Sequence, residues 1–227
     1  MVLKPMANDA HEHTFSMGDD SPLPNLATRA RPVSHYLRQR FAQVTNPPID
    51  PLRERLVMSL RTVLGPRQPL LTESAEAAEL LTLDSFFLYP SGVDALELTD
   101  KAPWPVIPLD TTFPAADGSG GLRAAVDRLV AEAIAAVEGG AGILVLEASA
   151  AGSEQAPVPS LLATGAVHQA LAESRLRSRT ALVVVADDVF DVHAFATLLG
   201  YGADAVCPAL ALATVAGEAD TADDGDL

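Results

Sequence analysis

The chain has 227 residues, which predicts one domain, and 48% of them are hydrophobic, enough for a substantial core. Its formal net charge of −15 would repel phosphates, which argues against nucleic acid and anionic membranes as partners. One cysteine excludes an internal disulfide framework and an all-cysteine iron–sulfur site. The sequence shows neither an apolar run of membrane-spanning length nor a signal peptide, so we expect a cytoplasmic protein without membrane contact.

The charge is unevenly distributed along the chain. Residues 1–70 contain nine Lys and Arg against six Asp and Glu, a net charge of +3, whereas residues 71–227 carry −18. Eight arginines fall within residues 29–67. They could form a contact surface for an acidic neighbour, or they could simply cover a solvated helix face.

The two ends of the chain show little hydrophobic periodicity. Residues 1–28 are interpreted as an N-terminal arm, in which His11 and His13 lack the spacing and the third ligand that a metal site requires. Residues 216–227 are predicted to be a disordered acidic tail, because their like charges repel one another. The predicted α/β domain therefore occupies residues 29–215.

A double-proline loop, residues 45–50, separates two predicted helices at residues 33–44 and 51–64. The Asn46-Pro47-Pro48 segment cannot continue a helix, because each proline fixes φ and lacks an N–H group. Asp50 is the expected N-cap of the second helix, whose leucines recur at every fourth position until a Gly-Pro pair ends it. The sequence thus predicts a rigid loop between two amphipathic helices.

The next segments are predicted as a short helix at residues 72–83 and an irregular stretch at 85–100, which contains Pro and Gly turn signals. Four apolar runs then alternate with helices. The runs are residues 106–109, 143–146, 181–185 and 205–207, and the helices are expected at residues 122–137, 160–176 and 189–199.

Continuous apolar strands are typical of a parallel sheet covered on both faces. Four β/α units are half of an eight-stranded barrel. We therefore predict an α/β fold in which N-terminal helices precede a four-unit parallel (β/α) half-barrel, a rudimentary TIM-barrel-like domain.

Three acidic residues, Asp110, Glu147 and Asp187, follow predicted strands. The carboxyl ends of barrel strands meet at one rim, where carboxylates could hold a divalent cation or perform acid–base chemistry. The alternative is that such residues cap the following helix. The set lacks a His or Lys partner and matches no catalytic motif, so we predict no catalytic and no metal-binding residue in this chain.

Two other features are weak candidates for chemistry. Cys207 ends the last predicted strand and is interpreted as a small buried hydrophobic residue. The glycine-rich residues 117–121 match no known phosphate loop, and we expect no cofactor in this chain.

Four segments resemble the central domain of the glutamate synthase large subunit. They are SMGDDSPLP (residues 16–24), FAQVTNPPIDP followed by LVMSL (41–60), PVPSLLATGAVH (157–168) and LLGYGADAVCP (198–208). The eleven-residue run with two prolines in fixed places is the most specific of the four. The polar residues after the second and third strands, including Glu147 and Asp187, differ from the family pattern.

The resemblance implies that the chain lies between two catalytic domains of a larger enzyme. Glutamate synthases join a glutaminase domain, this central domain, an FMN-binding barrel and a β-helix, and they make glutamate from glutamine and 2-oxoglutarate. The central domain links the catalytic domains and helps to shape the tunnel that carries ammonia. FMN and the iron–sulfur cluster belong to other domains, so the resemblance implies a protein that is not catalytic alone.

The same resemblance names the expected partners, which are the glutaminase and FMN-binding domains. One segment matches a stretch that the family places near the tunnel; it consists of Thr45, Asn46, Pro47, Pro48, Ile49 and Asp50. Two alternatives stay open. The chain could be an independent small (β/α) metal-dependent enzyme that uses the acidic rim, or a non-functional remnant.

Overall fold

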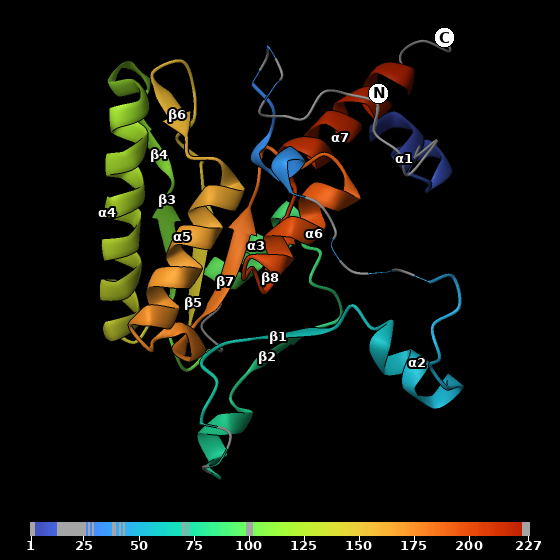
Figure 1. The fold of residues 1–227 in the computed structure, drawn as a ribbon, viewed down its shortest axis with the longest axis vertical. Coiled ribbons are helices and arrows are strands. Elements are labelled where there is room, and N and C mark those ends of the chain that lie inside the picture. The colour runs from blue at the N-terminus through green and yellow to red at the C-terminus, as the bar shows by residue number, and fades with distance from the viewer. Residues whose placement is uncertain are drawn as a thin grey trace.

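A computed structural model covers the chain and describes residues 3–12, 26, 28, 30–37, 40, 42, 44–69, 71, 73–98 and 102–223, the last six by their backbone alone. A four-stranded parallel sheet forms its centre (Figure 1). The spatial order of the strands is β3 (Val106–Asp110), β5 (Ile143–Glu147), β7 (Ala181–Val185) and β8 (Ala205–Cys207). Because this order follows the chain, each helical crossover returns to the neighbouring strand, as in one half of a (β/α)₈ barrel. The predicted fold class is confirmed.

Three helices cover the outer face of this sheet. They are α4 (Gly118–Glu138), α5 (Ser160–Glu173) and α6 (Val192–Gly200), and they lie side by side in Figure 1. Successive residues of a strand point to opposite faces, so Leu144 and Leu146 of β5 pack with these helices while Ile143 and Val145 point inward. All four side chains are buried, which explains why the strand is a continuous apolar run.

The inner face of the half-barrel is covered by elements that precede β3 in the chain rather than by four further strands. An antiparallel pair, β1 (Thr62–Leu64) and β2 (Leu81–Leu83), and helix α3 (Pro90–Glu97) supply this cover. Leu64, Leu88, Val93 and Leu96 pack there against the inward side chains of the parallel strands. These contacts form a second hydrophobic core on the inner face of the sheet, in addition to the core between the sheet and its outer helices.

The edge of the sheet at β8 is also covered. Leu88 N–H donates to the carbonyl of Val206 at 2.9 Å, and Val206 N–H donates to the carbonyl of Phe86 at 2.8 Å. This pairing is parallel and centred on Phe87. At the carboxyl end of the sheet, β4 (Thr112–Pro114) pairs antiparallel with β6 (Gln155–Pro157).

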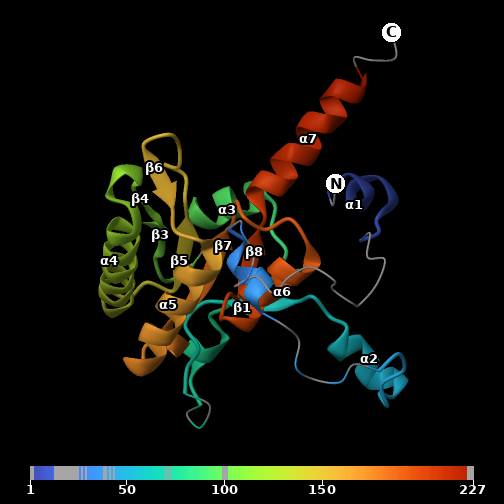
Figure 2. The same cartoon turned by 45° about the horizontal axis from the view of Figure 1, so that its top comes forward.

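Several elements project from this body. Helix α7 (Ala209–Asp223) extends away from the sheet with α1 (Leu3–Asp9) against it, and α2 (Pro51–Val57) stands apart on another side (Figure 2). No helix in the described ranges has the length and apolar character needed to cross a membrane.

The predicted N-terminal helices are shorter than expected. Of residues 33–44, only Val33–Tyr36 form a single 3₁₀ turn, while residues 38, 39, 41 and 43 lie outside the described part. The second predicted helix ends at Val57, and Leu64 lies in β1 instead. Leu64 is fully buried, and its burial against the inner face of the sheet overrides the helical leucine spacing.

Three further expectations need correction. The predicted helix at residues 72–83 contains only a 3₁₀ turn, Ala75–Ala78, followed by β2, and residue 72 is not described. The stretch predicted as irregular, residues 85–100, contains α3, because Pro90 begins a helix rather than a turn. The acidic residues 216–223 belong to α7, where a disordered tail was predicted.

Candidate functional site

The double-proline loop lies on the surface and leads directly into α2. Five of its six side chains are exposed, and Ile49 is half-buried. Ile49 N–H donates to the carbonyl of Pro47 at 2.8 Å, which folds the loop tightly. Each proline fixes φ, so the exposed loop has few backbone conformations available to it.

Asp50 fixes the junction between the loop and α2. Its Oδ1 accepts hydrogen bonds from the N–H groups of Leu52 and Arg53, both at 3.0 Å. Its Oδ2 lies 3.3 Å from Nε of Arg53. Pro51 occupies the first helical turn, where its missing N–H costs nothing. The predicted N-cap is confirmed.

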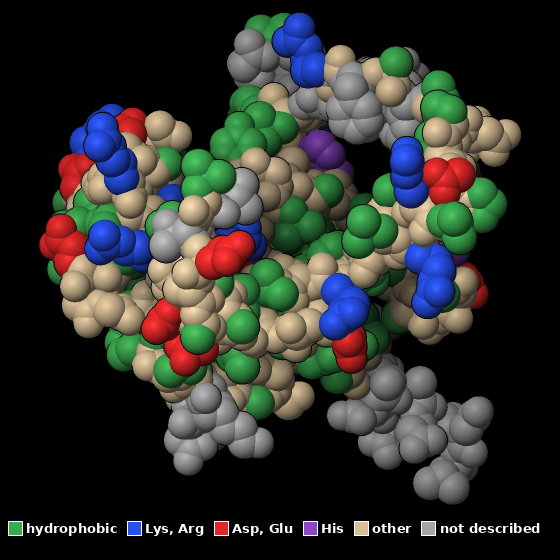
Figure 3. Space-filling model, turned by 90° about the horizontal axis from the view of Figure 1, so that it is seen from below, with side chains coloured by type: hydrophobic (Ala, Val, Ile, Leu, Met, Phe, Trp, Pro, Cys, Tyr) green, Lys and Arg blue, Asp and Glu red, His purple; other side chains and the backbone are tan. Residues whose placement is uncertain are grey.

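Helix α2 presents apolar side chains to solvent. None of its residues is buried, and Leu52 and Leu56 are 89% and 80% exposed. Met58 and Leu60, just beyond the helix, are also exposed. Seen from below, the lobe at the right of Figure 3 carries hydrophobic side chains beside basic ones. An amphipathic helix normally buries its apolar face, so this surface has the composition of a contact surface.

The acidic rim lies at the carboxyl ends of the parallel strands. Asp110 and Glu147 end β3 and β5 in the same register. Burial raises the pKa of Glu147, and the carboxylates of Glu97 and Asp110 act in the same direction. Burial likewise raises the pKa of Asp187, with a further contribution from Asp188.

The rim carboxylates take part in local hydrogen bonds. Asp110 accepts from the N–H and the hydroxyl group of Thr112, both at 2.9 Å. Asp188 accepts from the N–H of Ser160 at the start of α5, at 3.1 Å. These bonds hold carboxylates to backbone groups, but neither is the expected capping of the helix that follows the strand: Thr112 lies in β4, α4 has no side-chain cap, and Asp191 caps α6. Within the described residues, no group of three or more His, Cys, Asp and Glu is placed to hold a metal ion.

Cys207 is fully buried at the end of β8. Burial raises the pKa of its thiol to about 11, and the carboxylates of Asp187 and Asp94 contribute. A thiol with this pKa is almost entirely protonated at neutral pH and is a poor nucleophile. The interpretation of Cys207 as a buried hydrophobic residue is confirmed.

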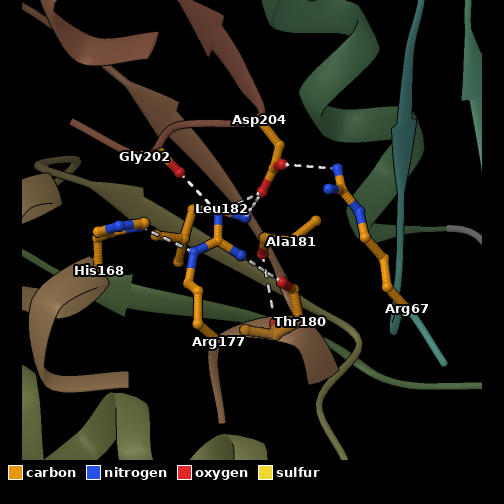
Figure 4. A network of polar contacts seen from close by, with 8 residues as sticks. All are labelled: Arg67, His168, Arg177, Thr180, Ala181, Leu182, Gly202 and Asp204. Atoms are coloured by element: carbon orange, nitrogen blue, oxygen red, sulfur yellow. Dashed lines mark hydrogen bonds and ion pairs between the residues drawn. The ribbon is translucent and has the colours of Figure 1, made fainter. Parts of the chain in front are cut away.

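A polar network at the amino end of the sheet was not predicted (Figure 4). Nη2 of Arg177 lies 2.7 Å from Oδ2 of Asp204 and also donates to the carbonyl of Gly202 at 2.7 Å. Nη1 of Arg177 donates to the carbonyl of Thr180 at 2.7 Å, and its Nε donates to Nδ1 of His168 at 3.0 Å. The network thus joins the turn before β7 to the turn before β8.

The role of this network is structural. Asp204 also accepts from the N–H of Leu182 at 2.9 Å and pairs with Arg67 at 3.2 Å, so it connects β7, β8 and the chain after β1. Its members are separated by up to 137 residues in the chain, and no short sequence pattern marks them. Sequence reasoning therefore missed this network.

Comparison with known proteins identifies the family of this chain. Residues 1–226 match the family described as the glutamate synthase central domain. The chain belongs to the glutamate synthase central-domain family. It is 45% identical over 219 residues to the ferredoxin-dependent glutamate synthase 2 of Synechocystis, and 43% identical over 214 residues to the NADH glutamate synthase of Schizosaccharomyces pombe. It is also 43% identical over 218 residues to the NADPH glutamate synthase large chain of Azospirillum brasilense.

These alignments cover nearly all of this chain and little of each relative. They include 95% of this chain and 14% of the Synechocystis protein, and 93% of this chain and 10% of the yeast protein. The resemblance read from the double-proline run and the three other segments is confirmed. The chain spans 10–14% of the length of these relatives, so it corresponds to one part of a much longer protein.

Proposed function

We propose that this chain is a non-catalytic central-domain protein of glutamate biosynthesis that links glutaminase and FMN-binding domains. In this proposal the double-proline loop forms part of the ammonia tunnel wall or of the partner surface. The observation that carries the proposal is the family match over the whole chain, combined with the exposure of the family's most specific motif. The expected setting is the cytoplasm.

The loop is suited to recognition for a physical reason. Its prolines restrict the free loop to conformations close to the one observed, so binding would cost little additional ordering. The exposed amide of Asn46 can donate and accept hydrogen bonds, either with a partner or with ammonia. Asp50 holds the loop in place by capping α2.

The proposal assigns the chemistry to other domains. FMN and the iron–sulfur cluster would be held by the partners, so the isolated chain should contain no flavin and make no glutamate. The absorption spectrum of the purified chain tests directly whether it contains flavin. A flavin band near one equivalent per chain would contradict the proposal.

The association itself can be measured by capture. The bait is this chain, and the prey are the two segments that flank the matched region in the Azospirillum brasilense large chain. We expect wild type to retain both segments and Asn46→Ala to retain less of them while keeping its melting temperature. Asn8→Ala, an exposed asparagine on α1, is the matched control. Absence of capture by wild type would refute the linking role.

The competing hypothesis of an independent metal-dependent enzyme has its own test. A cation that binds only the folded state must raise the melting temperature. We expect magnesium, manganese and zinc to leave it unchanged. A rise that Asp187→Ala abolishes would favour the enzyme.

A further inference from the structure

A groove separates α2 from the β1–β2 pair. Its volume is about 830 Å³. Apolar side chains of Leu52, Leu56 and Val63 line part of it, and the first two are among the most exposed leucines of the described residues.

The groove is attached to the body at both ends of β1. The carbonyl of Leu60 accepts a hydrogen bond from the N–H of Phe86 at 2.9 Å, and Arg67 N–H donates to the carbonyl of Ser178 at 2.6 Å. Its wall at β1 is therefore held in register with the half-barrel. The β1 wall of the groove is therefore formed before a partner binds.

The charged residues of this groove are all basic. Arg55, Arg61 and Arg67 line it, and no Asp or Glu is among the lining residues. Arg67 is paired with Asp204, whereas Arg55 and Arg61 form no ion pair with any described residue. A local positive charge of this kind is distinctive on a chain whose net charge is −15.

We propose that this groove binds an acidic amphipathic segment of a partner polypeptide. Apolar side chains of that segment would cover Leu52 and Leu56, and its carboxylates would pair with Arg55 and Arg61. Arginine forms bidentate hydrogen bonds with carboxylates, which adds orientation to attraction. The inference rests on the proposed linking role and adds to it a second contact, distinct from the double-proline loop.

The chemistry of the occupant can be tested with two labelled peptides. Both are 15-residue amphipathic helices built on leucine, one with glutamate and one with lysine on the polar face. Fluorescence anisotropy should show binding of the glutamate peptide only. The double variant Arg55→Glu/Arg61→Glu should weaken it about tenfold or more, and Leu56→Ser severalfold. Equal binding of both peptides, or an unchanged affinity of the double variant, would overturn the inference.

Two control variants separate the groove from general effects. Arg123→Glu/Arg179→Glu changes net charge by the same amount at exposed sites elsewhere, and Leu98→Ser removes another leucine that is 85% exposed. Both should bind the glutamate peptide as wild type does. If light scattering shows a dimer that Leu56→Ser converts to a monomer, the occupant is a second copy and the inference is wrong.

Capture of the flanking Azospirillum segments distinguishes this inference from the proposed function. Capture that is insensitive to the Arg55→Glu/Arg61→Glu and Leu56→Ser changes would refute the groove and leave the linking role intact. Binding of the glutamate peptide without capture of either segment would support the groove and refute the linking role.

Discussion

Asp204 and Arg177 form an ion pair of 2.7 Å beneath the parallel sheet, with their side chains 12% and 21% exposed. The same carboxylate oxygen accepts the N–H of Leu182 in β7. One acidic side chain in the turn before β8 therefore fixes the position of the neighbouring strand. The pair holds together two crossovers of the half-barrel.

Replacement of Asp204 by alanine should destabilise the protein strongly. It would leave the guanidinium of Arg177 largely buried without its carboxylate and the N–H of Leu182 without an acceptor. We expect a loss of about 3 kcal/mol in the free energy of unfolding, measured by urea denaturation. Arg67→Ala is the control: its side chain is 56% exposed, so the loss should stay below about 1 kcal/mol. If both variants lost the same free energy of unfolding, the ion pair of Asp204 with Arg177 would contribute no more to stability than the pair with Arg67.

His168 should make stability depend on pH. Burial lowers its pKa, and so does the guanidinium of Arg177, while Asp204 opposes them. Between this lowered value and 6.5, the unfolded chain binds a proton that the folded chain does not, so stability should fall as pH decreases through this window.

The matched variant is His168→Gln, which retains a hydrogen-bond acceptor for Arg177. We expect the free energy of unfolding, measured by urea denaturation, to decrease less between pH 7 and pH 5.5 in the variant than in wild type. The raised pKa values of Glu147 and Asp187 affect both proteins alike and cancel in the comparison. If this decrease were identical in the two proteins, His168 would not be the source of the pH dependence.

Asp50→Ala should loosen α2 without unfolding the body. Loss of the N-cap costs about 1 kcal/mol, but no residue of α2 is buried, so its opening is not coupled to the cores. Amide hydrogen exchange in residues 52–58 should accelerate about fivefold, with the melting temperature unchanged. A fall of several degrees in that temperature would show that α2 is coupled to the body.

Gly142→Ala should disturb the inner core. A Cβ atom at this position would collide with the indole ring of Trp104, whose Nε1 donates to the carbonyl of Glu79 at 3.2 Å. We expect a destabilisation of about 2 kcal/mol from overpacking and a red shift of the single tryptophan's fluorescence. Gly200→Ala, where a Cβ atom would meet nothing within 4 Å, should change neither quantity.

The sequence predicted the parallel sheet because its strands are buried on both faces. The apolar runs at Ala181–Val185 and Ala205–Cys207 coincide with β7 and β8. Prediction from the sequence failed where tertiary packing decides the conformation. Leu64 continues a helical spacing but is buried in a strand, and Pro90 resembles a turn residue but begins α3.

The candidate site was predictable only in part. Asp50 as N-cap follows from local chemistry within four residues, and the structure confirms it. The apolar face of α2 also followed from leucine spacing, but its exposure did not, since burial depends on segments distant in the chain. The contact of the double-proline loop with a partner or tunnel stays a prediction.

A chimaeric enzyme tests the central claim most directly. This chain would replace the matched region of the Azospirillum brasilense large chain, to which it is 43% identical. If it serves as a linking central domain, the chimaera should retain glutamine-dependent glutamate formation, and Asn46→Ala should reduce that activity without loss of bound FMN. A chimaera that folds and binds FMN, yet forms glutamate only from added ammonia, would contradict the tunnel role.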